Sequence, residues 1–207
     1  ADIRVLPNGV RVADRLAPRD QERSPLQLLF LGRLGKRKGI YELLHALARI
    51  RSTVPDFVLV AAGDGETEEV AKEAVRLGLA DNMVVPGWID AKRRQELLDR
   101  ADIFVLPSHA EGLPMSLLEA MAAGLPVVCS TVGGIPLAVS NEQEGLLVEP
   151  GDVVSLGRAL ARMMQDPSLR AACGRLAFER ARREFSVQTC VNRLLDIYQS
   201  YGIAIRR

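Results

Sequence analysis

The sequence predicts an α/β fold with a doubly wound parallel sheet and extra helices at its C-terminal end. Two observations predict it. Six short apolar segments of strand length recur between residues 26 and 148, and helical patterns separate most of them. Such an alternation of strand and helix is typical of a parallel sheet whose right-handed crossovers place helices on both faces. After residue 152 the apolar strands stop and only helical patterns follow.

The expected strands are short apolar runs between turn-forming residues. They span residues 26–31, 57–62, 83–85, 103–106, 127–129 and 145–148. The expected helices between them are 40–50, 67–77, 91–100 and 114–123. In the first helix Ile40, Leu43, Leu44 and Leu47 recur at steps of three and four residues, as in an amphipathic helix that covers a sheet. These elements predict a Rossmann-like domain over residues 26–184.

The two ends of the chain differ from this middle part. Residues 1–25 hold a turn at Pro7-Asn8-Gly9 and a polar run from residue 18 to 25, and we interpret them as an N-terminal segment or interdomain linker. Three helices are expected over 153–164, 169–184 and 187–201. Asp152 and Ser168 are the expected N-caps, with Pro167 at the boundary. We assign residues 185–207 to a separate C-terminal helix.

Composition narrows the classes of function. The chain has 27 Lys and Arg residues against 26 Asp and Glu residues, a net charge of +1, so nucleic acid is not an expected partner. No apolar run reaches the about 18 residues that span a bilayer, and no export signal is visible. The three cysteines, which are widely spaced, are expected to be reduced thiols rather than disulfide or zinc ligands. We therefore expect a cytoplasmic protein without a metal.

Ligands of doubly wound sheets bind beyond the carboxyl ends of the strands, so the site residues are expected in the loops there. The loop after the first strand runs from Gly32 to Gly39 and carries four cations in six residues. Arg supplies a planar fork of donors and Lys a compact charge, which together can neutralise a pyrophosphate leaving group. We expect Arg33 and Lys38 to form this clamp, with a solvated basic loop as the alternative.

Two glutamates follow the fourth strand, eight positions apart at Glu111 and Glu119. Pro114 suits the first turn of a helix. Because helical side chains lean toward their own N-terminus, Glu119 is expected to point at the turn of Met115 and Ser116, with Glu111 just before it. Both carboxylates can then face one ligand. The unpaired N–H groups of the helix N-terminus attract phosphate, so the arrangement suits a sugar nucleotide.

The remaining loops are ambiguous. The turn Gly63-Asp64-Gly65 favours a structural role because it lacks the third glycine of a dinucleotide site. Trp88 suits either contact with a base or packing. His109 is a candidate for acid/base chemistry, although a single loop histidine is more often incidental. The turn at Gly133-Gly134 favours a close approach of backbone N–H groups to a ligand, with a packing turn as the alternative.

Several of these segments together resemble the group 1, family four retaining glycosyltransferases of GT-B fold. The matching segments, in chain order, are Gly32-Arg33 with Lys38-Gly39, Pro107-Ser108, the spacing of Glu111 and Glu119, the run from Glu119 to Val128, and Gly133-Gly134-Ile135-Pro136. The resemblance runs from about residue 6 to the C-terminus. It implies the C-terminal, donor-binding half of a two-domain enzyme whose N-terminal acceptor domain is missing from this chain.

The resemblance also implies roles for residues at the donor diphosphate. Arg33 and Lys38 would hold it, and the backbone N–H groups around Leu113 and Met115 would complete the phosphate cradle. No metal or other cofactor is required in the family, because cations and helix ends stabilise the leaving group.

The two glutamates receive different roles from the resemblance. Glu119 would bind the ribose hydroxyls, and Glu111 would position the transferred sugar and stabilise developing charge rather than act as a nucleophile. Many relatives have Glu after the Gly-Gly-x-Pro turn where this chain has Leu137, which weakens any role for that turn.

The resulting hypothesis is the donor domain of a retaining, metal-independent glycosyltransferase. It would take a UDP- or GDP-sugar and transfer a hexose-type sugar to a glycan or lipid-linked acceptor. The C-terminal helix would pack back on the missing domain, and the full-length protein would be cytoplasmic, with peripheral association at the inner membrane face as an open option. The alternatives are a nucleotide-sugar epimerase of GT-B fold and a non-catalytic nucleotide-sugar-binding module.

Overall fold

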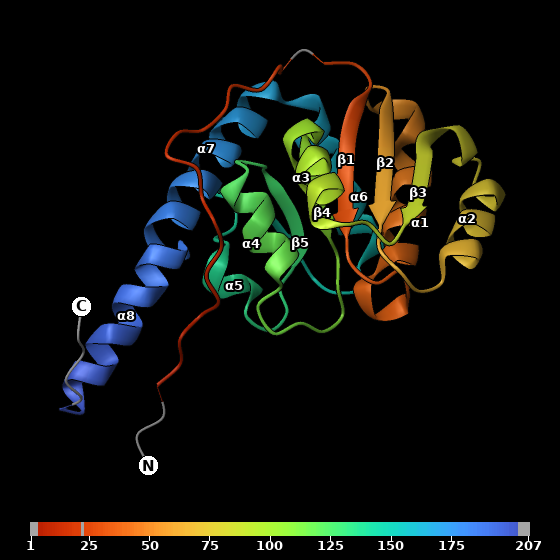
Figure 1. Cartoon of the computed structure of the whole chain (residues 1–207). Helices are drawn as coiled ribbons and strands as arrows, with labels where there is room; N and C mark the ends of the chain where they lie inside the picture. The colour runs from red at the N-terminus through yellow and green to blue at the C-terminus, as the bar shows by residue number, and fades with distance from the viewer. Residues whose placement is uncertain (1–3, 22, 203–207) are drawn as a thin grey trace.

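The structure is a computed structural model that describes residues 4–21 and 23–202. A six-stranded parallel sheet forms its centre, in the order β3-β2-β1-β4-β5-β6 (Figure 1). The strands are β1 (Leu26–Leu31), β2 (Phe57–Ala62), β3 (Met83–Gly87), β4 (Ile103–Leu106), β5 (Val127–Ser130) and β6 (Gly145–Val148). All six expected strands are present, and the doubly wound fold class is confirmed.

The helices follow the predicted alternation. They are α1 (Ile40–Ile50), α2 (Thr67–Arg76), α3 (Ala91–Arg100), α4 (Met115–Ala122), α5 (Ile135–Ala138), α6 (Val153–Gln165), α7 (Pro167–Glu184) and α8 (Val187–Ser200), with three short 3₁₀ turns at Lys36–Lys38, Arg51–Thr53 and Ala80–Asn82. The single turn α5 was not expected from the sequence. None of the helices in the described ranges is both long and apolar enough to cross a membrane.

One expected helix cap is wrong. Helix α7 begins at Pro167, and its N-cap is Asp166, whose carboxylate accepts a hydrogen bond from the Leu169 N–H at 2.9 Å. Pro167 has no N–H to donate, so it fits the first helical position and leaves the capping role to the residue before it. Asp152 caps α6 as expected, accepting from Val154 N and Ser155 N.

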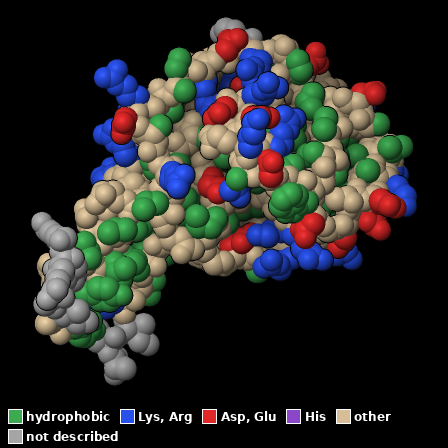
Figure 2. All heavy atoms as spheres, viewed as in Figure 1, with side chains coloured by type: hydrophobic (Ala, Val, Ile, Leu, Met, Phe, Trp, Pro, Cys, Tyr) green, Lys and Arg blue, Asp and Glu red, His purple; other side chains and the backbone are tan. Residues whose placement is uncertain are grey.

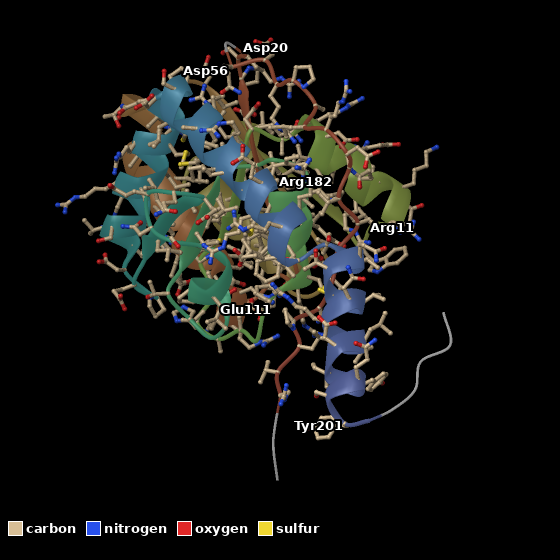
Figure 3. The ribbon with its side chains drawn as sticks, turned by 90° about the vertical axis from the view of Figure 1, so that its left-hand side faces the viewer. Arg11, Asp20, Asp56, Glu111, Arg182 and Tyr201 are labelled. Carbon is tan, nitrogen blue, oxygen red and sulfur yellow. The ribbon has the colours of Figure 1, made fainter. Side chains whose placement is uncertain are left out.

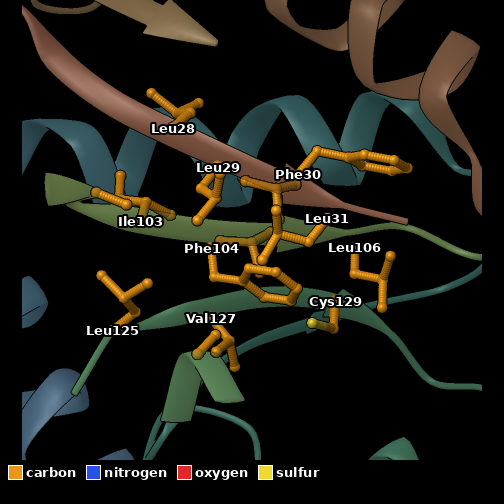
Figure 4. Packing of buried hydrophobic residues seen from close by; sticks show 14 of the residues in the cluster. Leu28, Leu29, Phe30, Leu31, Ile103, Phe104, Leu106, Leu125, Val127 and Cys129 are labelled. Carbon is orange, nitrogen blue, oxygen red and sulfur yellow. The ribbon is translucent and has the colours of Figure 1, made fainter. Parts of the chain in front are cut away.

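The sheet core is built on the pairing of β1 with β4, where Leu28 lies beside Ile103 and Leu29 beside Phe104. These side chains are fully buried, as Figure 4 shows from close by. Helix α1 packs against α6 on one face of the sheet and α4 against α7 on the other, so central strands are apolar on both faces. Burying each large side chain stabilises the fold by about 1.5–3 kcal/mol.

Residues 4–21 form an extended segment, here called the N-terminal strap, that lies along the domain. Val10 accepts a hydrogen bond from Val187 N at 3.0 Å and donates to Phe185 O at 2.8 Å. Farther along, the Arg19 guanidinium donates to four carbonyl oxygens at the C-terminal ends of two helices, at 2.5–3.2 Å. These belong to Leu98, Asp99, Ala101 and Ala123. The strap therefore ties α3 to α4.

Helix α8 extends beyond the sheet in the same direction as the start of the strap (Figure 1). It carries partly exposed apolar side chains at Val187, Val191 and Tyr198, and exposed Tyr201 follows its last residue. Figure 2 shows hydrophobic side chains gathered on this projecting arm. An exposed apolar helix of this kind is typical of a surface that another part of a protein covers.

The contacts of Arg19 predict that its removal destabilises the fold more than removal of another arginine of the strap. Replacing Arg19 by Ala leaves four helix-end carbonyls without their cationic donor, so we expect the free energy of unfolding to fall by about 2–3 kcal/mol. Urea denaturation followed by circular dichroism measures this. The control is Arg15→Ala, an exposed strap residue, which we expect to change stability by less than about 0.5 kcal/mol. Equal effects of the two substitutions would contradict the role of Arg19.

Candidate functional site

The loops after β1 and β4 meet at the carboxyl edge of the sheet, because these strands are neighbours. The backbone N–H of His109 donates to the backbone carbonyl oxygen of Arg37 at 2.9 Å. Gly39 has a φ of 72°, and a Cβ there would lie 2.0 Å from Pro107 O. Only glycine permits this approach of the two backbones. The predicted convergence of the cationic loop and the glutamate loop is therefore built from main-chain contacts.

Lys38 and Glu111, two of the predicted site residues, are in direct contact. Lys38 Nζ lies 2.5 Å from Glu111 Oε1, and the side chains are only 15% and 6% exposed. Ser108 Oγ donates to the same oxygen at 2.7 Å. Ser130 Oγ in turn donates to Ser108 O at 2.5 Å. The carboxylate is thus oriented by one cation and one hydroxyl, and sequence reasoning did not assign these roles to the two serines.

The Gly133-Gly134 turn supports the loop that carries Glu111. Gly134 N donates to Gly112 O at 2.5 Å. Gly133 has a φ of 55°, and a Cβ there would lie 1.9 Å from Glu111 O. The Gly134 N–H is therefore already paired, contrary to the expectation that this turn offers it to a ligand. The close approach of the two backbones fits the packing alternative.

Glu119 belongs to a separate cluster on the facing sides of α3 and α4. Its Oε1 lies 3.4 Å from Arg94 Nη2, and the two side chains are 21% and 45% exposed. Burial raises the pKa of the Glu119 carboxyl, and Arg94 opposes that rise. Both residues, with Met115, line a groove of about 800 Å³ between these helices and the strap. Glu111 is not among the residues that line this groove, and Figure 3 shows it among the loops, away from Arg11 of the groove.

Arg33 and the start of α4 are accessible. The Arg33 side chain is exposed and makes no hydrogen bond or ion pair within the described ranges. Helix α4 begins at Met115, which is 38% exposed, with Pro114 as an N-cap that supplies no side-chain hydrogen bond. Leu113 is partly buried before it. The first-turn N–H groups of α4 therefore carry no side-chain cap in this structure.

The ambiguous loops take distinct roles. A Cβ on Gly63 would lie 2.0 Å from Gly32 O, so this turn packs against the cationic loop, in agreement with a structural role. Trp88 is 75% exposed after β3, which argues against packing. His109 Nε2 lies 2.9 Å from Glu42 Oε1, so its ring is held by a different carboxylate from Glu111.

All three cysteines are free and buried, and burial raises the pKa of the Cys129 thiol far above its ordinary value. Across residues 4–21 and 23–202, no three His, Cys, Asp or Glu side chains gather in a way that could hold a metal ion.

Comparison with known proteins identifies the family of the chain. Residues 16–180 match the model of the family described as glycosyl transferases group 1. Glycogen synthase from Mycobacterium tuberculosis is 35% identical over 200 residues, which cover 96% of this chain and 48% of the relative. A D-inositol 3-phosphate glycosyltransferase from Acidothermus cellulolyticus is 34% identical, over 99% of this chain and 49% of the relative. The chain spans about half the length of these curated relatives.

Solved structures share the fold. Sucrose-phosphate synthase from Thermosynechococcus elongatus superposes with a TM-score of 0.84 at 26% identity, covering 98% of this chain and 53% of that one. Anabaena Alr3699/HepE in complex with UDP-glucose gives 0.77 at 25% identity, covering 86% and 49%. The C-terminal domain of LpcC, a group 1 glycosyl transferase from Francisella tularensis, gives 0.73 at 25% identity, covering 79% and 87%.

The backbone contact behind Glu111 predicts a sharp difference between two glycines. We expect Gly133→Ala to lower the free energy of unfolding by at least about 2 kcal/mol, because a Cβ there meets Glu111 O at a positive φ. Gly112→Ala is the control, since a Cβ on Gly112 meets no atom within 4 Å. Thermal denaturation of both variants measures the difference. A Gly133→Ala protein as stable as the control would show that the turn does not hold the loop.

Proposed function

Because the chain belongs to the glycosyl transferases group 1 family, we propose that it is the donor-binding domain of a glycosyltransferase that uses a sugar nucleotide. The contact between Lys38 and Glu111 at 2.5 Å supports this most directly. It pairs a cation suited to a diphosphate with a carboxylate suited to sugar hydroxyls, at the edge where doubly wound sheets bind ligands.

The diphosphate is proposed to lie between the cationic loop and the start of α4. Arg33 is exposed, and Lys38 in the same basic loop is partly buried with its Nζ at Glu111, so we propose that the anion binds against both cations. The first N–H groups of α4, near Leu113 and Met115, supply uncapped donors for phosphate oxygens. These charges and donors stabilise the diphosphate as a leaving group.

The transferred sugar and the ribose are proposed to bind to different carboxylates. A diphosphate held by Lys38 lies next to Glu111, so the sugar attached to it can donate hydroxyl hydrogen bonds to that carboxylate. Glu119 lines the neighbouring groove and would accept from the ribose hydroxyls. In this scheme Glu111 positions the sugar and stabilises developing charge. HepE, whose structure contains UDP-glucose, supports a UDP-hexose as the donor, and a GDP-hexose is the second proposed candidate.

The acceptor is proposed to bind a domain that this sequence does not include. The chain covers 48% of glycogen synthase and 49% of the D-inositol 3-phosphate glycosyltransferase, so a further domain of similar size fits the missing part. The apolar arm of α8 offers a surface for it. The chain alone is then expected to bind donor but to transfer little, because much of the rate comes from positioning both substrates.

The finer features of the reaction stay predictions of the resemblance. They are retention of anomeric configuration, independence from a metal, a glycan or lipid-linked acceptor, and a location in the cytoplasm or at the inner face of its membrane. The epimerase alternative requires an acid/base group beside the sugar. Its candidate from the sequence, His109, contacts Glu42 and not Glu111, so it is not joined to the carboxylate proposed to hold the sugar.

Donor binding is tested by titration calorimetry of the 207-residue chain with UDP, GDP and their hexose derivatives. We expect one nucleotide series to bind and Arg33→Ala to weaken it by about tenfold or more, because a charge-assisted contact to phosphate is lost. The matched control is Lys36→Ala, another exposed cation of the same loop, with an expected change below about twofold. Failure of all these ligands to bind, or equal effects of the two substitutions, would refute the proposed diphosphate clamp.

A further inference from the structure

We propose that Arg94 is a positioning residue that holds the Glu119 carboxylate in place for the ribose hydroxyls of the donor. The inference rests on the proposed function, since it assumes that Glu119 binds ribose. It goes further by assigning a role to a residue on a different helix, which neither the motif nor the family comparison marks.

The geometry places the pair at one position of the groove. Arg94 is the fourth residue of α3 and Glu119 the fifth of α4. Their side chains reach toward each other between the two helices, with 3.4 Å between Arg94 Nη2 and Glu119 Oε1. Both line the groove of about 800 Å³, which falls within the size of sites for small ligands.

The charges of the groove single out Arg94. Its other charged lining residues are Arg11, Arg15, Arg19 and Asp99. Arg19 is occupied by helix-end carbonyls, and within the described ranges Arg94 is the cation that forms an ion pair with Glu119. Burial raises the pKa of the Glu119 carboxyl. The positive charge of Arg94 opposes that rise and so favours the ionised carboxylate. An ionised carboxylate is acceptor-only, as two neighbouring ribose hydroxyls require.

The ion pair also leaves part of the carboxylate available. Arg94 approaches Oε1, and within the described ranges Oε2 makes no hydrogen bond or ion pair. A ribose hydroxyl can therefore donate to Oε2 while Arg94 fixes the orientation of the group. Without Arg94, the side chain of Glu119 would lose this restraint and would have to be ordered when the ligand binds, which costs affinity.

The neighbouring arginine provides a matched control. Arg93 lies next to Arg94 on α3, but its guanidinium pairs with Glu96 of the same helix at 2.8 Å. The two side chains have similar exposure, 51% and 45%. Substituting Arg93 therefore removes the same charge from the same helix without touching Glu119.

The test separates ribose contacts from all others by comparing UDP and GDP with their 2′,3′-dideoxy analogues in calorimetric titrations. We expect Arg94→Ala to weaken the better-binding nucleotide by about fivefold and to change binding of its dideoxy analogue by less than about 1.5-fold. Arg93→Ala should leave both unchanged. Arg94→Lys, which keeps the cation, should recover part of the loss. A purely structural role of Arg94 would weaken both ligands equally.

Further outcomes decide between the two proposals. If Glu119→Gln abolishes the preference for the hydroxylated ligand while Arg94→Ala preserves it, the role of Arg94 is refuted and the proposed function stands. Tighter binding by Arg94→Ala would mean that Arg94 competes with ribose for Glu119, and it also overturns the positioning role. Failure of UDP and GDP to bind at all would refute both proposals.

Discussion

The adjacency of β1 and β4 is the constraint on which the site depends. The chain adds β2 and β3 on one side of β1 and then returns to place β4 on the other, so two loops separated by about 70 residues of sequence begin side by side. The contact between Lys38 and Glu111 is possible only because of this reversal. Main-chain contacts at Gly39 and Gly133 then hold both loops at short range, which leaves little freedom for the carboxylate.

Much of the fold could be predicted because its signals are local. Buried strands such as β1 and amphipathic helices such as α1 have strong periodic patterns, and their predicted ranges agree with the structure. Prediction failed where the signal was short or ambiguous. Helix α5 has only four residues, too few for periodicity, and edge strand β3 alternates in burial through to Gly87, past its predicted end at residue 85. At the start of α7, Pro167 lies between Asp166 and Ser168, and either residue type can cap a helix.

The site was predictable to the extent that topology alone determines it. The position of Lys38 and Glu111 on one edge follows from strand order, so the motif positions predict that their loops converge but not that the two side chains form an ion pair. The partners that orient each carboxylate could not be predicted. Arg94 lies on a different helix from Glu119, and Ser108 lies in the same loop as Glu111, but neither residue type is unusual in its segment. Only packing in three dimensions reveals which serine or arginine reaches which carboxylate.

The N-terminal strap has a consequence for the electrostatics of α4. Arg19 donates to Ala123 O at 2.7 Å, at the end of the helix where the aligned peptide dipoles place partial negative charge. The opposite end of the same helix, at Met115, carries partial positive charge and faces the proposed diphosphate. One short helix thus has a fixed cation at its negative pole and space for an anion at its positive pole. The strap, which also lines the groove proposed for the ribose, thus holds a cation where it favours an anion at the opposite end of the helix.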